Sequence, residues 1–431
     1  DGARCFIPLP LRAESVAPVC IPGKAVGTEQ DPAASFRGQV GPLVLLTLIF
    51  FLNFLARIIL APLLPALEQD LHLDHGEAGS LFLLISLGYC TSLLGSGLVS
   101  SRLSHRKTIT LSALAAGIPL IALCFGNRLW QIQTALVALG LATGLYLPSG
   151  IATITSLIPP KHWGKGIAIH EVAPNLCAVV APFISEALLP WVSWWGILAL
   201  IGGASVIVGI AFWRFGAGGR FSGQAPTVSA FRALLGERSF WAMTALLSLA
   251  ISASLGVYTM FPLYLVAERG IDRSWANILV GLSRASGLAA VFLAGWAADR
   301  IGPRQIMQWV FLLTGTFTLL LGGVPGYWVA GVFFLQQLFA VCFFPAGLAA
   351  LSAIGPPHAR NLAVSLSIPI AFVAGAGVTP TLIGVMGDAG SFTGGIVLVG
   401  GLILSGFVIC LRLRVPGENG CSSRPVHLDS H

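Results

Sequence analysis

The chain of 431 residues is 55% hydrophobic and only 10% charged, with a formal net charge of +7. A soluble domain carries roughly 25% charged residues, so this composition excludes an ordinary water-soluble protein. The Lys and Arg residues stand at the ends of apolar runs and do not cluster with aromatic side chains, which excludes a nucleic-acid-binding protein and indicates a chain embedded in a lipid bilayer.

The first segment, residues 1–40, differs from everything that follows it. Several prolines and scattered charges interrupt it, and it lacks the uninterrupted apolar core and cleavage site of a signal peptide. We expect a disordered cytoplasmic tail here, and a second tail over 415–431.

Long apolar runs then recur along the chain. Each covers the ~20 residues that a helix needs to cross ~30 Å of hydrocarbon. Twelve such runs are present, at 43–66, 78–100, 108–126, 129–157, 167–190, 194–214, 240–266, 275–298, 306–323, 327–354, 363–387 and 392–411. A Gly- and Arg-containing stretch, 215–239, separates the sixth run from the seventh. The sequence therefore predicts an all-α membrane protein with two six-helix bundles, 41–214 and 240–414, joined by a cytoplasmic linker.

The basic residues between the runs test this count. If the N-terminus is inside, the outer loops contain only Arg128, Arg269 and Arg273. The inner loops and ends contain Arg102, Arg106, Lys107, Lys161, Lys165, Arg214, Arg220, Arg232, Arg238, Arg300, Arg304, Arg360, Arg412 and Arg414. Basic residues favour the cytoplasmic side, so we expect both termini to be cytoplasmic.

The two predicted bundles resemble each other at an offset of 197 to 198 residues. Residues 148–160 read PSGIATITSLIPP and residues 345–357 read PAGLAALSAIGPP. Pro182 in the fifth run matches Pro380 in the eleventh. A repeat of this kind is typical of transporters whose two halves are pseudo-symmetric and hold the substrate between them.

A second repeated element resembles a family signature. Gly295, Asp299, Arg300, Gly302 and Arg304 follow the eighth run in the pattern of the signature loop of the major facilitator superfamily. The resemblance covers residues 41–414 and implies a secondary transporter that works by alternating access. It also implies that this loop contributes to the cytoplasmic gate.

The first-half copy of the loop is degenerate. Gly97, Arg102 and Arg106 are kept, but Ser101 stands in place of the Asp and Ser104 in place of the second Gly. We expect both loops to contribute to the cytoplasmic gate, with Asp299 as the main charged latch.

Two further stretches narrow the resemblance. Gly140 to Pro148 resembles the fourth-helix motif of the superfamily, but Leu136 stands where that motif usually has Arg, which fits poorly with proton-driven drug efflux. Residues 51–67 and 170–175 are similar to the organophosphate and organic-anion branches.

Two arginines stand inside the apolar runs, where an ionisable residue costs about 2.5–3.5 kcal/mol and usually faces a water-filled path. Arg57 and Arg284 approach the same depth from opposite halves. Two planar guanidinium groups facing one cavity would bind a carboxylate or phosphate. Asn53, one turn before Arg57, and the hydroxyls of Tyr146 and Tyr258 are further candidates for substrate binding. The alternative is that each Arg is a structural residue held by Glu or by backbone carbonyls.

His170 and Glu171 begin the fifth run. Either could carry a coupling proton, or the pair could be an interfacial cap near Lys165. Asn175, one turn beyond Glu171, could line the substrate cavity.

No metal, cofactor or enzymatic activity is expected. The cysteines form no CxxC pair, no phosphate-binding loop is present, and no Ser, His and Asp combine at a spacing suited to nucleophilic catalysis. The predicted function is secondary transport of a small organic or inorganic anion by a monomer, in contact with lipid, in the inner membrane of a bacterium. The alternatives are efflux of amphipathic compounds and a transporter-like sensor that does not cycle.

Overall fold

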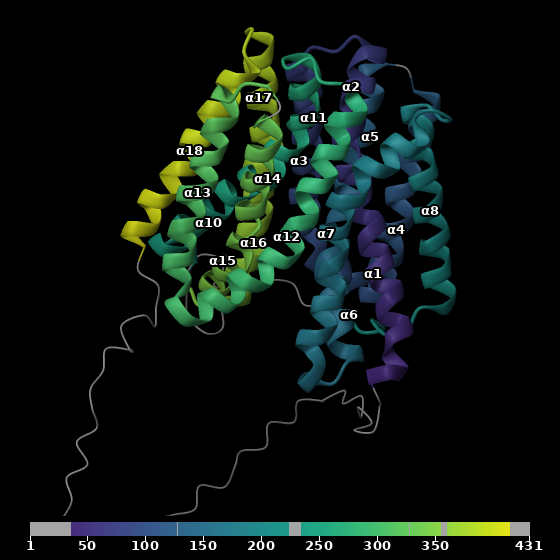
Figure 1. Cartoon of the computed structure of the whole chain (residues 1–431). Helices are drawn as coiled ribbons and strands as arrows, with labels where there is room; N and C mark the ends of the chain where they lie inside the picture. The colour runs from purple at the N-terminus through teal and green to yellow at the C-terminus, as the bar shows by residue number, and fades with distance from the viewer. Residues whose placement is uncertain (1–35, 127, 224–233, 327, 355–359, 414–431) are drawn as a thin grey trace, which may run out of the picture. The chain divides into compact units, whose positions relative to one another are not determined.

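The computed structural model describes residues 36–126, 128–223, 234–326, 328–354 and 360–413. Within these ranges, twelve helical spans are long and apolar enough to cross a membrane, which confirms the predicted number (Figure 1). The spans built on one α-helix are α3 (His75–Leu103), α4 (His105–Ala122), α7 (Trp163–Leu188), α8 (Trp194–Phe215), α12 (Arg273–Ile301), α13 (Pro303–Gly323) and α18 (Phe392–Arg412). The interrupted spans are α1 (Phe36–Ile58) with α2 (Leu60–Leu71), α5 (Leu129–Gly144) with α6 (Tyr146–Leu157), α10 (Arg238–Ile251) with α11 (Val257–Ala267), α14 (Trp328–Ala340) with α15 (Phe343–Ser352), and α16 (Arg360–Phe372) with α17 (Thr379–Asp388).

Prolines explain most of the interruptions. A proline has no N–H for the carbonyl four residues earlier, and its ring crowds that carbonyl. The breaks before α2, α6 and α15 fall just ahead of Pro62, Pro148 and Pro345. The other two interrupted spans contain a wider π-helical turn, at Ser252–Gly256 and Val373–Val378. Such turns leave backbone carbonyls free to accept hydrogen bonds from side chains.

The glycines of the fourth-helix motif allow two helices to touch. A Cβ atom added to Gly140 would lie 2.2 Å from the carbonyl oxygen of Ile85, and one added to Gly144 would lie 2.5 Å from that of Tyr89. Only glycine permits this approach of α5 to α3, as in other small-residue contacts between membrane helices. The contact fixes α3 and its inward-facing side chains against the rest of the first bundle.

The sequence repeat has a structural counterpart. The Arg106 guanidinium donates to the carbonyl of Trp213 at 2.8 Å, near the end of α8. In the second half, Arg304 donates to the carbonyls of Cys410 and Leu411, near the end of α18. Arg106 and Trp213 match Arg304 and Leu411 at the offset of 198 residues that the sequence shows. Each arginine thus places a positive charge at the negative end of the last helix in its own bundle, which confirms the pseudo-symmetry.

The two bundles are bonded to each other at one face. We call the face where α1 begins and α18 ends the terminal face, and the other the opposite face. At the opposite face, the Asp388 carboxylate accepts hydrogen bonds from the backbone N–H groups of His75 and Gly76, both at 2.8 Å. Nearby, Glu186 accepts from the Asn277 side chain at 2.5 Å. These contacts join α17 to α3 and α7 to α12.

The expected tails and linker are only partly described. α1 begins at Phe36, inside the range expected for the first tail. The rest of that tail, residues 224–233 of the linker and residues 414–431 lie outside the described residues. The observed ends of α8 and α10, Phe215 and Arg238, fall at the bounds expected for the linker.

Candidate functional site

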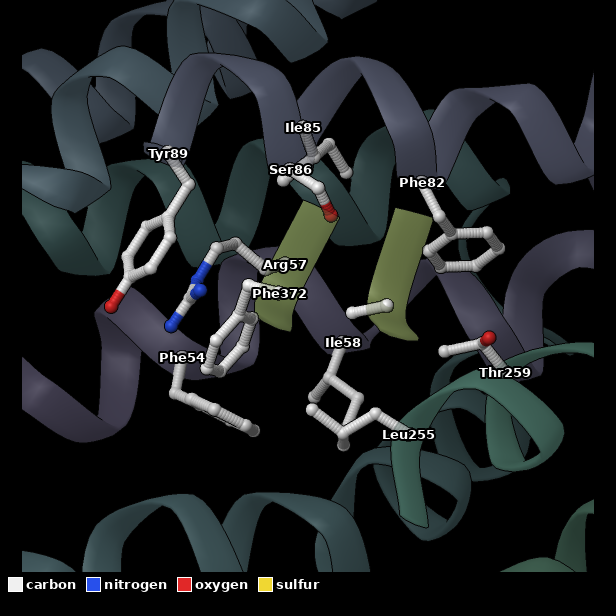
Figure 2. A pocket seen from close by; sticks show the side chains of 11 residues that line it. Phe54, Arg57, Ile58, Phe82, Ile85, Ser86, Tyr89, Leu255, Thr259 and Phe372 are labelled. Carbon is white, nitrogen blue, oxygen red and sulfur yellow. The ribbon is translucent and has the colours of Figure 1, made fainter. Parts of the chain in front are cut away.

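A cavity lies between the two bundles, near the middle of the spans. It holds about 440 Å³ of space free of protein atoms, part of which is open solvent. Residues of both bundles line it: Phe54, Arg57, Ile58, Phe82, Ile85, Ser86, Tyr89, Leu255, Thr259, Phe372 and Ala376 (Figure 2). The cavity is therefore mostly apolar and aromatic, with few polar groups.

Arg57, one of the candidates for substrate binding, is the charged residue among those that line this cavity. Its guanidinium carbon lies 4.2 Å from the ring centroid of Tyr89, 4.9 Å from that of Phe54 and 5.8 Å from that of Phe372. Its Nε donates to the Asn53 carbonyl in its own helix at 3.4 Å. Within the described residues no carboxylate pairs with it. The aromatic rings thus hold the cation through cation–π contacts, and Tyr89 also shares a side-chain hydrogen bond with it, so its partners are aromatic and neutral.

Arg284 lies elsewhere. Its side chain is buried, with 7% of its surface exposed, and it does not line the cavity of Arg57. One of its terminal nitrogens donates to the Ser254 carbonyl, which belongs to the π-helical turn between α10 and α11. Its guanidinium carbon lies 4.7 Å from the Tyr258 ring centroid, and Tyr258 donates its hydroxyl to the Ala178 carbonyl at 2.8 Å. In this structure Arg284 and Tyr258 join α12, α11 and α7, as structural residues would.

Asn53 also faces away from the cavity. Its side-chain amide donates to the Ser112 hydroxyl at 3.2 Å and to the Thr143 carbonyl at 3.3 Å, and it is buried. Asn53 therefore ties α1 to α4 and α5. Only its backbone carbonyl reaches Arg57.

Tyr146 and His170 form a buried stack with Phe50. The His170 ring lies 4.3 Å from the Phe50 ring and nearly parallel to it, at 3°. The Tyr146 hydroxyl donates to the Leu46 carbonyl at 2.7 Å and lies 3.1 Å from His170 Nε2. Since the hydroxyl proton is used on Leu46, His170 Nε2 must carry the hydrogen that the Tyr146 oxygen accepts.

Because Nε2 carries the hydrogen, Nδ1 of a neutral His170 presents a lone pair to Glu171. His170 Nδ1 lies 3.3 Å from Glu171 Oε1. If the imidazole were neutral and the carboxylate ionised, two lone pairs would face each other. One proton between Nδ1 and Oε1 would remove that repulsion. Glu171 is half-exposed and Asn175, which donates to the Glu171 carbonyl at 3.0 Å, is exposed.

Tyr89 lines the cavity beside Arg57. It lies under the Arg57 guanidinium and interacts electrostatically with both Arg57 and Glu171. A change of charge at Glu171 therefore acts on the same tyrosine that holds Arg57. The structure brings Arg57 together with Tyr89 in the cavity, and His170 together with Tyr146 and Glu171 in a second group of contacts.

The second-half loop expected at the cytoplasmic gate lies at the terminal face. Gly302 ends α12 with a φ of 94°, and Gly295 is one of the α12 residues. Arg300 stacks over the Trp296 ring at 4.2 Å, and Asp299 is exposed and has no partner among the described residues.

In the first half, a segment of the linker covers the equivalent loop. His105 N–H donates to the Phe221 carbonyl at 3.1 Å, Arg106 N–H to the Gly219 carbonyl at 2.7 Å, and Gly223 N–H to the Ser100 carbonyl at 3.0 Å. We call residues 216–223 the strap. It accepts hydrogen bonds from the first N–H groups of α4, which would otherwise lack partners. It also covers the first-half copy of the signature loop, whose Gly97 and Arg102 lie in the last turns of α3.

Of the residues that line the cavity, the sequence singled out Arg57 but not most of the others. Phe82, Ser86 and Tyr89 recur along one face of α3, and Thr259 and Phe372 face them from the second bundle. The spacing on α3 was readable, but an apolar helix in a membrane shows little contrast between its faces. The contribution of Thr259 and Phe372 depends on how the two bundles dock.

Comparison with known proteins places the chain among transporters. A family model described as the Major Facilitator Superfamily matches residues 46–292 and 270–426. The gallate transporter of Pseudomonas putida is 24% identical over 331 residues, which cover 69% of this chain and 73% of that protein. The phosphoglycerate transporter protein of Salmonella typhimurium is 20% identical over 387 residues, covering 80% of this chain and 82% of that protein.

A solved structure has the same fold. A bacterial homolog of the human lysosomal transporter Spinster, in an inward-facing and occupied conformation, superposes with a TM-score of 0.75. It is 16% identical, and the match covers 88% of this chain and 97% of that one.

Proposed function

We propose, because the chain belongs to the Major Facilitator Superfamily, that its transported solute is a small organic anion that binds Arg57. Membership in this family makes the chain an integral membrane protein and a secondary transporter rather than an enzyme. The named solutes of the two curated relatives, gallate and phosphoglycerate, are organic anions.

The observation that carries the proposal is a guanidinium in the cavity that has no carboxylate partner among the described residues. A cation at mid-membrane costs about 2.5–3.5 kcal/mol, and among the described residues no carboxylate offsets that cost for Arg57. An anionic solute would do so and would accept two parallel hydrogen bonds from the planar donor fork. The solute then completes a site that the protein leaves incomplete.

The proton site at His170 and Glu171 supports coupling to a proton gradient. The titratable groups around it are Tyr146 and, beyond Glu171, Tyr89 with Arg57. Ionised Glu171 repels an incoming anion, whereas protonated Glu171 does not. Proton and anion therefore favour each other's binding, which is the requirement for symport.

A transport assay tests the coupling. Proteoliposomes should accumulate radiolabelled benzoate when the pH is lower outside, and should also exchange it without a gradient. Glu171→Gln should keep the exchange but lose the accumulation, because the glutamine accepts no proton. Glu77→Gln, at the exposed start of α3, serves as the matched control and should behave like the wild type. Accumulation above that of protein-free liposomes that persists in Glu171→Gln would contradict the proton site, and the absence of protein-dependent uptake of any anion would contradict the proposal.

A second candidate is efflux of amphipathic compounds. It is favoured by the mostly apolar lining of the cavity, in which Arg57 carries the charge. The same proteoliposomes distinguish the two, since an exporter of this kind would bind neutral or cationic dyes in competition with benzoate.

The positive-inside pattern supports an orientation with both termini in the cytoplasm, and we place the protein in a bacterial inner membrane as a monomer. In that orientation the contacts of Asp388 and Glu186 close the outer side, and the cavity belongs to a state that faces the cytoplasm.

A further inference from the structure

The cavity has two chemically different ends. Arg57 lies with Tyr89, Phe54 and Phe372 at one end, whereas Phe82 and Thr259 lie at the other, and the Ser86 hydroxyl points into the space between (Figure 2). A solute that binds Arg57 through an anionic group must place its remaining atoms along this aromatic passage.

The charge of the cavity limits the charge of the solute. Arg57 supplies the positive charge of the lining, and Arg284 is held outside it by Ser254. Glu171, an acidic group that acts electrostatically on Tyr89 at this end, is negative when ionised. A second negative charge on the solute would lack a partner and would be poorly solvated among phenyl rings. The cavity therefore favours a monoanion over a phosphorylated acid.

The shape and faces of the lining favour a flat ring. Phe54, Phe82, Phe372 and Tyr89 line the cavity from three segments of the chain, two in the first bundle and one in the second. Aromatic pairs gain stability beyond the area that they bury when rings stack or meet edge to face. A saturated ring of similar size would bury a similar area without that gain.

Two hydroxyl groups in the cavity lining could form hydrogen bonds with a polar substituent of the solute. Ser86 is buried, with 6% of its surface exposed, and its hydroxyl bonds to no other described residue. Thr259 donates its proton to the Gly256 carbonyl at 3.0 Å, which leaves its oxygen able only to accept. A solute hydroxyl or amine could donate to Thr259 and exchange a hydrogen bond with Ser86.

We infer that the cavity selects aromatic monocarboxylates with a hydrogen-bonding substituent remote from the carboxylate, and that Ser86 and Thr259 determine this specificity. The inference rests on the proposed binding of an organic anion at Arg57. It adds the ring, the single charge and the second polar group.

The test is equilibrium binding to the purified full chain with three probes: benzoate, its para-hydroxy derivative and cyclohexanecarboxylate. The para-hydroxy acid should bind about tenfold more tightly than benzoate, the usual gain from one or two neutral hydrogen bonds. Cyclohexanecarboxylate should bind several-fold more weakly than benzoate.

Variants assign the effect to the hydroxyls. Ser86→Ala and Thr259→Val should each weaken binding of the para-hydroxy acid several-fold more than binding of benzoate and so remove much of the preference, with the folded fraction measured separately by size-exclusion chromatography. Ser80→Ala, in the exposed first turns of the same helix, is the matched control for Ser86 and should keep the preference. Equal losses for benzoate and the para-hydroxy acid would overturn the assignment of the two hydroxyls.

Different results would overturn the anion site and the selectivity for ring and substituent. Equal affinity for all three probes, with binding still lost in Arg57→Lys, would overturn the ring and substituent selectivity and leave the anion site standing. Binding of none of the three would overturn both.

Discussion

At the scale of single residues, Ser104 shows how the degenerate signature loop is built. Gly302 ends α12 with φ 94° and ψ 144°, and Ser104 ends α3 with φ 79° and ψ 154°. The backbone of the loop is thus the same in both halves, although this region is essentially restricted to glycine and costs a side chain about 1–3 kcal/mol. The hydrogen bonds that the His105 and Arg106 N–H groups donate to the strap hold Ser104 in this conformation.

The strain predicts a stabilising substitution. Ser104→Gly should raise the free energy of unfolding by about 1 kcal/mol, since the relief of strain exceeds the ~0.5–1 kcal/mol entropic cost of glycine. The reciprocal change, Gly302→Ser, should lower it. Thermal unfolding of the purified protein in detergent measures both. A Ser104→Gly variant that is less stable than the wild type would show that the serine side chain contributes more than its backbone conformation costs.

The site residues differ in how far the sequence alone could identify them. Arg57 was identifiable because a charge inside an apolar run is expensive and needs a reason. Arg284 met the same criterion, but its depth along the chain did not reveal that it faces α11 and Ser254 rather than the cavity. Ser86 and Thr259 gave no signal, since small hydroxyl residues are common in membrane helices and usually bond to their own backbone.

At the scale of elements, the strap is the part of the fold that the sequence did not suggest. The stretch 215–239 was expected to be a linker, whereas residues 216–223 dock on the first bundle through backbone hydrogen bonds. Glycines make this possible: a Cβ added to Gly219, whose φ is 67°, would lie 2.7 Å from Thr153 Oγ1 and 3.0 Å from the Arg106 backbone nitrogen. The helical spans, by contrast, were predictable, because their length and apolar composition are imposed by the bilayer.

The strap predicts a site-specific loss of stability. Gly219→Ala should lower the free energy of unfolding by about 1–2 kcal/mol, because the new side chain requires a strained φ and displaces Thr153 or Arg106. Gly203→Ala in α8, where a Cβ would meet nothing within 4 Å, is the control and should have no such effect. Limited proteolysis of the linker should become faster in Gly219→Ala alone. Equal stability of the two variants would contradict docking of the strap.

At the scale of the whole molecule, the contacts of Asp388 and Glu186 set which side of the transporter is closed. The Asp388 carboxylate meets the positive end of α3 and accepts two backbone N–H groups there, a charge-assisted contact between the bundles. Alternating access requires this contact to break in each cycle, so it stabilises one state without being needed for folding.

Removing the negative charge of Asp388 should therefore shift the population of conformations. Asp388→Asn should increase the fraction open at the opposite face about tenfold, since a charge-assisted bond contributes ~1.5–3 kcal/mol. Distances between spin labels on the α2–α3 and α17–α18 turns report that fraction. Asp272→Asn is the matched control: Asp272 also accepts from two backbone N–H groups at a helix start, those of Ser274 and Trp275, but within its own helix. A shift of the same size in Asp272→Asn would show that the effect is not due to the inter-bundle contact.

The central proposal is that Arg57 is the anion-binding group. Equilibrium binding of radiolabelled benzoate to purified protein, normalised to the folded fraction, tests this directly with Arg57→Lys and Arg284→Lys. Lysine keeps the charge but loses the planar donor fork, so Arg57→Lys should weaken binding by ~1.5–3 kcal/mol, roughly ten- to a hundredfold. Arg284→Lys should reduce the yield of folded protein, because Arg284 bonds the Ser254 carbonyl, and should leave the affinity of the folded fraction unchanged. Unchanged affinity in Arg57→Lys, or a loss of affinity confined to Arg284→Lys, would contradict the account.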